Sequence, residues 1–124
     1  KENIMTSKYV QPGEVIDYVA GSTITSGQVV RIGNILGVAL AAIANGATGS
    51  VQITGVFTVA KVSAAVIAQG ESLTWDTSAS AFDDNLATPA TGDVTGPPAV
   101  AFEAAGNGVT TIKVKFTGVP GTVT

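Results

Sequence analysis

The 124-residue sequence contains no cysteine and no histidine. Their absence excludes disulfide bonds, thiolate nucleophiles, Cys/His zinc sites and imidazole acid–base chemistry. A Ser-His-Asp triad is excluded as well, because no histidine is present to activate a serine. Charged residues are scarce too, at 12% of the chain, about half of the roughly 25% usual for a globular domain. The sequence therefore offers little of the chemistry that most enzymes use.

The few charges are mostly acidic: nine acidic and six basic residues give a formal net charge of -3. Proteins that bind nucleic acid need a basic surface to displace counterions from phosphates, and six scattered basic residues do not provide one. The longest apolar run, residues 35–44, is about half of the roughly 20 residues needed to cross a bilayer. The first residues show no apolar run of the signal-peptide type. We therefore expect no direct contact with nucleic acid or a membrane, and synthesis in the cytoplasm.

The sequence is rich in glycine and in short runs of valine, isoleucine and threonine. The clearest run, residues 51–59, alternates apolar and polar side chains, as a strand with one buried face requires. The same alternation in residues 109–116 predicts that Ile112, Val114 and Phe116 face the core. Six further segments are predicted strands: residues 14–19, 28–32, 35–42, 71–76, 82–88 and 99–104.

About eight short strands separated by glycine turns predict an all-β fold, a single-domain antiparallel jelly-roll-like sandwich or small barrel. Residues 35–43 also match helical spacing, but their glycines and β-branched neighbours favour a strand. Residues 63–69 are consistent with one helical turn between a Ser63 N-cap and a Gly70 stop. We expect no internal repeat.

Alternation also assigns individual side chains to the core. Leu73 and Trp75 share one face of residues 71–76, and Val100 and Phe102 share one face of residues 99–104. We predict that these four side chains point inward and that Glu103 points outward. A tryptophan within a strand is a core residue rather than an exposed platform for ligand stacking.

The first thirteen residues lack alternation and end in the turn signal Pro12-Gly13. We therefore divide the chain into an extended N-terminal arm (1–13), a β-domain (14–117) and a C-terminal tail (118–124). Apolar side chains on an arm gain from burial against a partner, and an extended arm can add to a sheet edge. The candidate residues for contact with a partner protein or with a second copy are Ile4, Met5, Tyr9, Val10, Gln11 and Pro12. The alternative is that residues 9–11 begin the first strand of the domain itself.

Two motifs have some features of ligand sites. Asp76, Asp83, Asp84 and Asn85 form the only acidic cluster, but their spacing does not match a calcium-binding loop and such residues are common in turns. The glycine-rich segment 46–50 lacks the lysine of a phosphate-binding loop and precedes a strand. We expect no catalytic residues, no metal, no cofactor and no enzymatic activity.

The order of several segments resembles the phage capsid cement, or decoration, proteins, a family long described as a domain of unknown function. The resemblance covers about residues 8–117 and includes an opening QPG, an SGQVV strand entry, a TGVF strand, an AQG turn before a Trp-Asp strand end, and a closing hairpin. The segments are YVQPGEVIDYV (9–19), TSGQVVRIGNILGVALAAIANG (25–46), VQITGVFTVAK (51–61), AQGESLTWDTSASAF (68–82) and AVAFEAAGNGVTTIKVKF (99–116). The stretch 83–98 is longer and richer in proline and glycine than the family pattern.

The resemblance implies a structural virion protein that binds the outside of a tailed-phage capsid and cements neighbouring major capsid subunits. It implies two partners, the major capsid protein and further copies of this chain as a homodimer or homotrimer. The protein would be made in the bacterial host cytoplasm and end on the outer capsid surface. Family members sometimes carry a recombinase-like label, for which this sequence has neither a phosphate-binding loop nor a basic groove. The alternative function is a virion-surface module that recognises a carbohydrate or host receptor.

Overall fold

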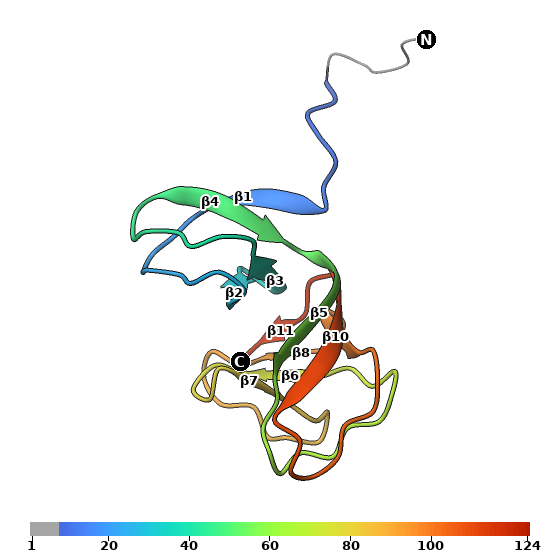
Figure 1. Ribbon diagram of the computed structural model, residues 1–124. Coiled ribbons are helices and arrows are strands. Elements are labelled where there is room, and N and C mark those ends of the chain that lie inside the picture. Colours follow the sequence, from blue (N-terminus) through green and yellow to red (C-terminus); the bar gives the residue numbers. More distant parts are fainter. Residues whose placement is uncertain (1–7) are drawn as a thin grey trace.

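The computed structural model describes residues 8–124, and all regular structure in that range is β (Figure 1). The strands pair antiparallel in three sheets, which confirms the predicted all-β antiparallel fold. The described range contains eleven strands, against the eight expected: β1 (Val15–Val19), β2 (Val29–Ile32), β3 (Ile35–Ala39), β4 (Thr48–Gln52), β5 (Thr54–Ala60), β6 (Thr74–Asp76), β7 (Ala81–Asp83), β8 (Val94–Thr95), β9 (Ala99–Ala101), β10 (Thr111–Thr117) and β11 (Thr122–Val123).

The first sheet has the strand order β1-β4-β3-β2. Its β2–β3 hairpin closes through Gly33 and Asn34, and Gly33 has a φ of +59°, which the tight turn requires. One face of the sheet packs on a small apolar cluster of Ala20, Ile24, Val30, Ala39, Ile43 and Val51. Residues 35–39 form β3, so the strand interpretation of that segment is confirmed.

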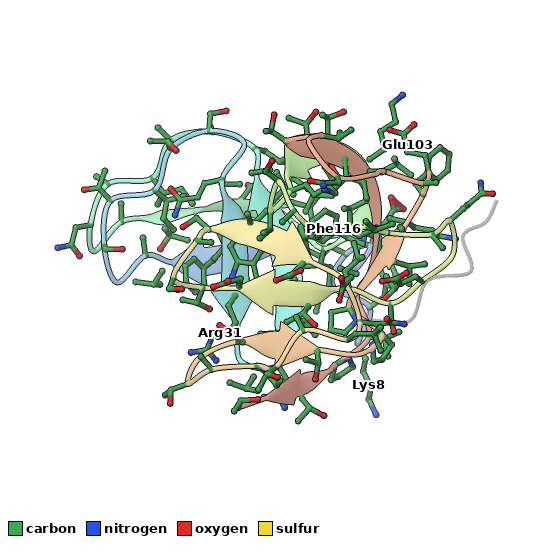
Figure 2. The ribbon with its side chains drawn as sticks, turned by 90° about the horizontal axis from the view of Figure 1, so that it is seen from below. Lys8, Arg31, Glu103 and Phe116 are labelled. Carbon is green, nitrogen blue, oxygen red and sulfur yellow. The ribbon has the colours of Figure 1, made fainter. Side chains whose placement is uncertain are left out.

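The main core draws side chains from all three sheets, the other two having the orders β5-β10-β9 and β11-β8-β6-β7. Three aromatic rings are central to it: Phe82 packs 4.9 Å from Trp75 and 5.9 Å from Phe116 between ring centroids. Figure 2 shows Phe116 in the middle of the molecule, with Arg31 and Glu103 at its edges. The predicted inward positions of Leu73, Trp75 and Phe116 are therefore confirmed.

The chain passes from the first sheet to the second at Ile53, between the end of β4 and the start of β5. The single strand predicted for residues 51–59 is therefore wrong: its two halves belong to different sheets. Two glycines permit the bend. Gly55 has a φ of +116°, and Gly37 lets β3 approach so closely that a Cβ there would lie 2.7 Å from the Gln52 carbonyl oxygen.

The prediction that Phe102 faces the core is also wrong, since half of its surface (50%) is exposed. β9 ends at Ala101, and its inward residues are the small Ala99 and Ala101, paired with Phe116 and Val114 of β10. Large inward side chains on β10 leave room only for small ones on β9. Residues 63–69 contain no helical turn either.

A repeated backbone motif contradicts the expectation of no internal repeat. Segment 20–27 pairs with segment 39–46, and segment 63–70 pairs with segment 101–108, each through one antiparallel bridge, Ile24 with Ile43 and Ile67 with Ala105. Each of the four segments ends in a glycine with a positive φ, which closes a turn. The N–H of this glycine donates to the carbonyl oxygen of the first residue of the segment with which it pairs. These bonds run from Gly27 to Ala39 (2.8 Å), Gly46 to Ala20 (2.8 Å), Gly70 to Ala101 (2.9 Å) and Gly108 to Ser63 (2.8 Å).

The last residues return to the body of the protein. β11 pairs with β8, and Gly121 exchanges two hydrogen bonds with Asn34 at 2.8 and 3.0 Å. The division into arm, β-domain and tail at residues 13 and 117 remains a prediction. Within residues 8–124 no helix is long and apolar enough to cross a membrane.

Candidate functional site

The described part of the arm, residues 8–13, is exposed along its whole length and has no strand. Figure 1 shows it leading away from the start of β1. Tyr9 is 47% exposed and Val10 is 86% exposed. β1 begins at Val15, so residues 9–11 do not begin the first strand of the domain. Of the six predicted contact residues, Ile4 and Met5 lie outside the described residues.

The arm joins an uncovered part of the first sheet. β1 is the edge strand of this sheet. Tyr18 contacts the small apolar cluster on one face of the sheet. Val15, Asp17 and Val19 alternate with Ile16 and Tyr18 along the strand and therefore lie on the opposite face. Val19 is 62% exposed. A hollow of about 520 Å³ lies where the arm meets this face, lined by Gln11, Pro12, Glu14, Val15, Asp17 and Ser50.

One hydrogen bond fixes the direction in which the arm leaves. The Gln11 side-chain amide Nε2 donates to the carbonyl oxygen of Val15 at 3.1 Å. In an antiparallel pair, alternate residues of a strand bond to the neighbouring strand. The Glu14 carbonyl oxygen accepts from the Ile53 N–H at 2.9 Å, so the backbone groups of Val15, Asp17 and Val19 point away from β4. We call residues 9–12 together with Glu14, Val15, Asp17 and Val19 the arm surface.

The arm surface combines apolar side chains with negative charge. Tyr9, Val10 and Val19 offer area that gains from burial, while the exposed Glu14 and Asp17 make no ion pair with any residue in the described range. An uncovered strand edge carrying a charge is protected against random pairing but remains open to a matched strand. The arrangement can bind a protein partner; it contains no nucleophile activated by a base.

The acidic cluster behaves as the turn interpretation predicts. Asp76 Oδ1 accepts from the Ser78 hydroxyl at 2.8 Å and from the Ala79 N–H at 3.1 Å, and these bonds lower the pKa of Asp76 below its ordinary value of 3.8. Asp83 and Asp84 each accept a local backbone N–H. In the part of the chain that the structure describes, no group of three acidic, histidine or cysteine residues is placed to hold a metal ion.

A second hollow, of about 280 Å³, lies between the turn before β2 and the end of β5. Trp75 lines it, but only 7% of Trp75 is exposed and its ring packs against Phe82. A sugar-binding site needs an aromatic face open to its ligand. The hollow therefore gives no support to the carbohydrate-binding alternative.

A scan against protein-family models matches residues 10–116 to a family described as phage cement protein. The chain belongs to that family. The match confirms the resemblance drawn from the sequence, and it includes every residue of the arm surface except Tyr9. A search of the curated proteins finds no match. The members of this family are structural virion proteins that stabilise the capsid, so the chain has a structural role and binds the phage capsid in the virion.

Sequence reasoning did not foresee that Lys61 is buried: it is 3% exposed and donates from Nζ to backbone carbonyl oxygens. The signal was present: Phe57, Val59 and Lys61 continue one alternating face, so Lys61 falls on the inward side of β5. The charge of Lys61, taken alone, indicates a side chain exposed to solvent. Its four acceptors come from loops whose approach no local pattern indicates.

Proposed function

We propose that this protein cements neighbouring major capsid subunits from the outside of a tailed-phage head, and that the arm surface is the part that contacts the shell. One observation carries the proposal: residues 8–13 are wholly exposed and extend away from the domain, although Tyr9 and Val10 are apolar. Such side chains gain free energy when a partner covers them. Beyond the Val15 carbonyl, which accepts from Gln11, the edge of β1 offers the backbone groups of Asp17 and Val19 for an added strand.

Binding through many weak contacts is the proposed mechanism. A contact of standard size buries about 800 Å² on each partner, and an arm of a few residues covers less than that. Several copies acting on one rigid shell, or one copy touching two subunits, gain from effective concentration. We propose that the protein binds isolated capsid subunits weakly and assembled, expanded shells strongly, that further copies of itself are its other partners, and that it contacts neither nucleic acid nor membrane.

The experiment is co-sedimentation with purified shells. Replacing Tyr9 and Val10 by serine alters the arm surface itself and should abolish shell binding, whereas deleting residues 1–8 removes the predicted contacts Ile4 and Met5 and should weaken it. Both variants should keep the melting temperature of the wild type. Leu86→Ser is the matched control, because Leu86 is 88% exposed in a loop outside the arm surface. Equal affinity for isolated subunits and shells would contradict the mechanism. So would arm variants that lose stability while the surviving folded protein still binds.

A further inference from the structure

The side-chain carboxylates of the described residues fall into two groups. Most are satisfied within the chain, by hydrogen bonds at Glu71, Asp76, Asp83, Asp84 and Asp93 and by the ion pair with Lys113 at Glu103. Glu14 and Asp17 differ: both are exposed, and within residues 8–124 neither makes an ion pair or a side-chain hydrogen bond. The two carboxylates that the fold leaves without a partner in this range therefore both lie on the arm surface.

These two carboxylates border the same space. Glu14 and Asp17 line the hollow of about 520 Å³ at the base of the arm, and its other walls are the uncharged Gln11, Pro12, Val15 and Ser50. A hollow lined by charge of one sign concentrates counter-ions of the other sign. Its volume is many times the roughly 30 Å³ of a water molecule. A long basic side chain suits such a hollow, because its methylene stem packs on Pro12 and Val15 while its charged end meets the carboxylates.

The edge of β1 determines how a partner would present that side chain. The backbone groups of Asp17 and Val19 point away from β4, so an added strand would pair with them. A residue opposite Asp17 lies on the same face of the sheet, with its Cβ about 5 Å from that of Asp17. Two positions along the added strand, the next side chain on this face lies against Val19, which is 62% exposed. Opposite charge favours the first pair and apolar burial favours the second.

We infer that the arm surface binds an extended segment of the major capsid protein in which a lysine or arginine lies opposite Asp17 and an apolar residue, two positions away, lies opposite Val19. The inference rests on the proposed function, which supplies the capsid as the partner. It adds the chemistry by which the arm surface selects one segment of that partner. Charge complementarity of this kind acts on specificity and on the association rate, and salt screens it.

Shell binding of the double variant Glu14→Gln/Asp17→Asn tests the inference, by co-sedimentation between about 50 mM and about 500 mM salt. At low salt the variant should bind at least about tenfold more weakly than the wild type. The difference should shrink as the salt concentration rises, because salt screens the attraction that only the wild type has. Both changes replace exposed groups that bond to nothing in the described range, so the melting temperature should not change.

The matched control is Asp84→Asn/Glu103→Gln, which brings the formal net charge from -3 to -1 as the test variant does, but outside the arm surface. It should bind shells as the wild type does at each salt concentration. Equal binding by the wild type and the Glu14→Gln/Asp17→Asn variant throughout the salt range would overturn the inference. So would a control that weakens binding as much as the test variant, because net charge alone would then explain the effect.

Cross-linking identifies the segment itself. The chain has no cysteine, so Gly13→Cys supplies a single thiol between Pro12 and Glu14, and nothing lies within 4 Å of a Cβ at that position. A benzophenone attached to this thiol should link, when decorated shells are irradiated, to a capsid segment with a lysine or arginine and an apolar residue two positions apart. Links only to an acidic capsid segment, or only to another copy of this chain, would overturn the inference.

The inference and the proposed function fail in different ways. If the bound segment is not basic, the Glu14→Gln/Asp17→Asn variant binds like the wild type, while replacing Tyr9 and Val10 by serine still abolishes binding. If the cementing role is wrong, the wild type itself does not sediment with shells at any salt concentration, and the inference falls with it.

Discussion

The buried carboxylate of Asp93 accepts a hydrogen bond from the backbone N–H of Thr77 at 3.0 Å, sixteen residues earlier in the chain. Its other oxygen accepts from the Ala90 N–H at 2.9 Å, and Asp93 is only 4% exposed. One side chain thus ties the β6–β7 turn to the turn before β8. Because both donors would lose a charged acceptor that is itself buried, the bond pair should matter to stability.

We expect Asp93→Ala to lower the free energy of unfolding by about 2 kcal/mol, because two backbone N–H groups lose a charged acceptor. Asp93→Asn keeps one side-chain oxygen and should cost less. Urea denaturation of both variants measures the difference. Asp84→Ala is the control, since the partly exposed Asp84 accepts a single N–H, from Leu86. An Asp93→Ala protein as stable as the control would refute the assignment.

Lys61→Met should destabilise the protein by about 3 kcal/mol, because four carbonyl oxygens lose their shared donor while the methionine still fills the space of the stem. Thermal or urea unfolding checks this. The matched change Lys115→Met, at an exposed position on β10, should stay within about 0.5 kcal/mol of wild type. Comparable losses in the two variants would mean that the carbonyl enclosure contributes nothing.

Gly37→Ala should cost about 1–3 kcal/mol, because the added methyl group overpacks the bend between β4 and β5. Its carbon would lie 2.6 Å from Val51 Cγ1 and 2.7 Å from the Gln52 carbonyl oxygen. Gly21→Ala is the control, as nothing lies within 4 Å of a Cβ at that position. Denaturant unfolding measures both, and a Gly37→Ala protein as stable as Gly21→Ala would contradict the expected clash.

The pKa of Asp76 predicts a loss of stability in acid. Hydrogen bonds from Ser78 and Ala79 lower that pKa below 3.8, so the ionised carboxylate stabilises the folded state above about pH 4. This contribution disappears as the pH falls through the lowered pKa. The unfolding free energies of wild type and Asp76→Asn, followed from pH 7 to pH 2, should differ at neutral pH and converge in acid. A constant difference would show that the carboxylate's ionisation plays no part.

The fold class followed from the sequence because alternation is a local property. Residues 109–116 alternate without interruption, and β10 is the predicted strand with Ile112, Val114 and Phe116 buried. The bend at Ile53 could not be predicted in the same way. Alternation continues across it, and one of the two glycines that permit the bend, Gly37, lies on another strand.

The inward face of β9 was missed for a related reason. Choosing the larger residues, Val100 and Phe102, for the core assumes that each strand packs alone. The register instead places Ala99 and Ala101 against Phe116 and Val114. The volume of the side chains on β10 therefore limits the size of the inward side chains on β9. The exposure of Phe102 is the result.

The arm is the part of the candidate site that sequence could indicate, because a segment without alternation has no face to bury. The enclosure of Lys61 is different, since it depends on the bridge between Ile67 and Ala105 and on contacts between two loops. These bring together residues more than thirty positions apart. The repeated glycine turns were hidden because the bridge residue changes from isoleucine to alanine in the fourth segment.

The pairing of β1 with β4 determines how the molecule responds to a pulling force. The two strands are antiparallel, so the start of β1 lies beside the end of β4, with Val15 opposite Gln52. A tension between an anchored arm and the rest of the protein therefore enters both strands at the same end. It meets the Glu14–Ile53 bond first and then the following pairs one by one, towards Val19 and Thr48. Strands loaded in this way peel apart like a zipper rather than resisting all at once in shear. Under the proposed function the arm would thus be a compliant tether, which could lengthen by releasing β1 before the main core is loaded.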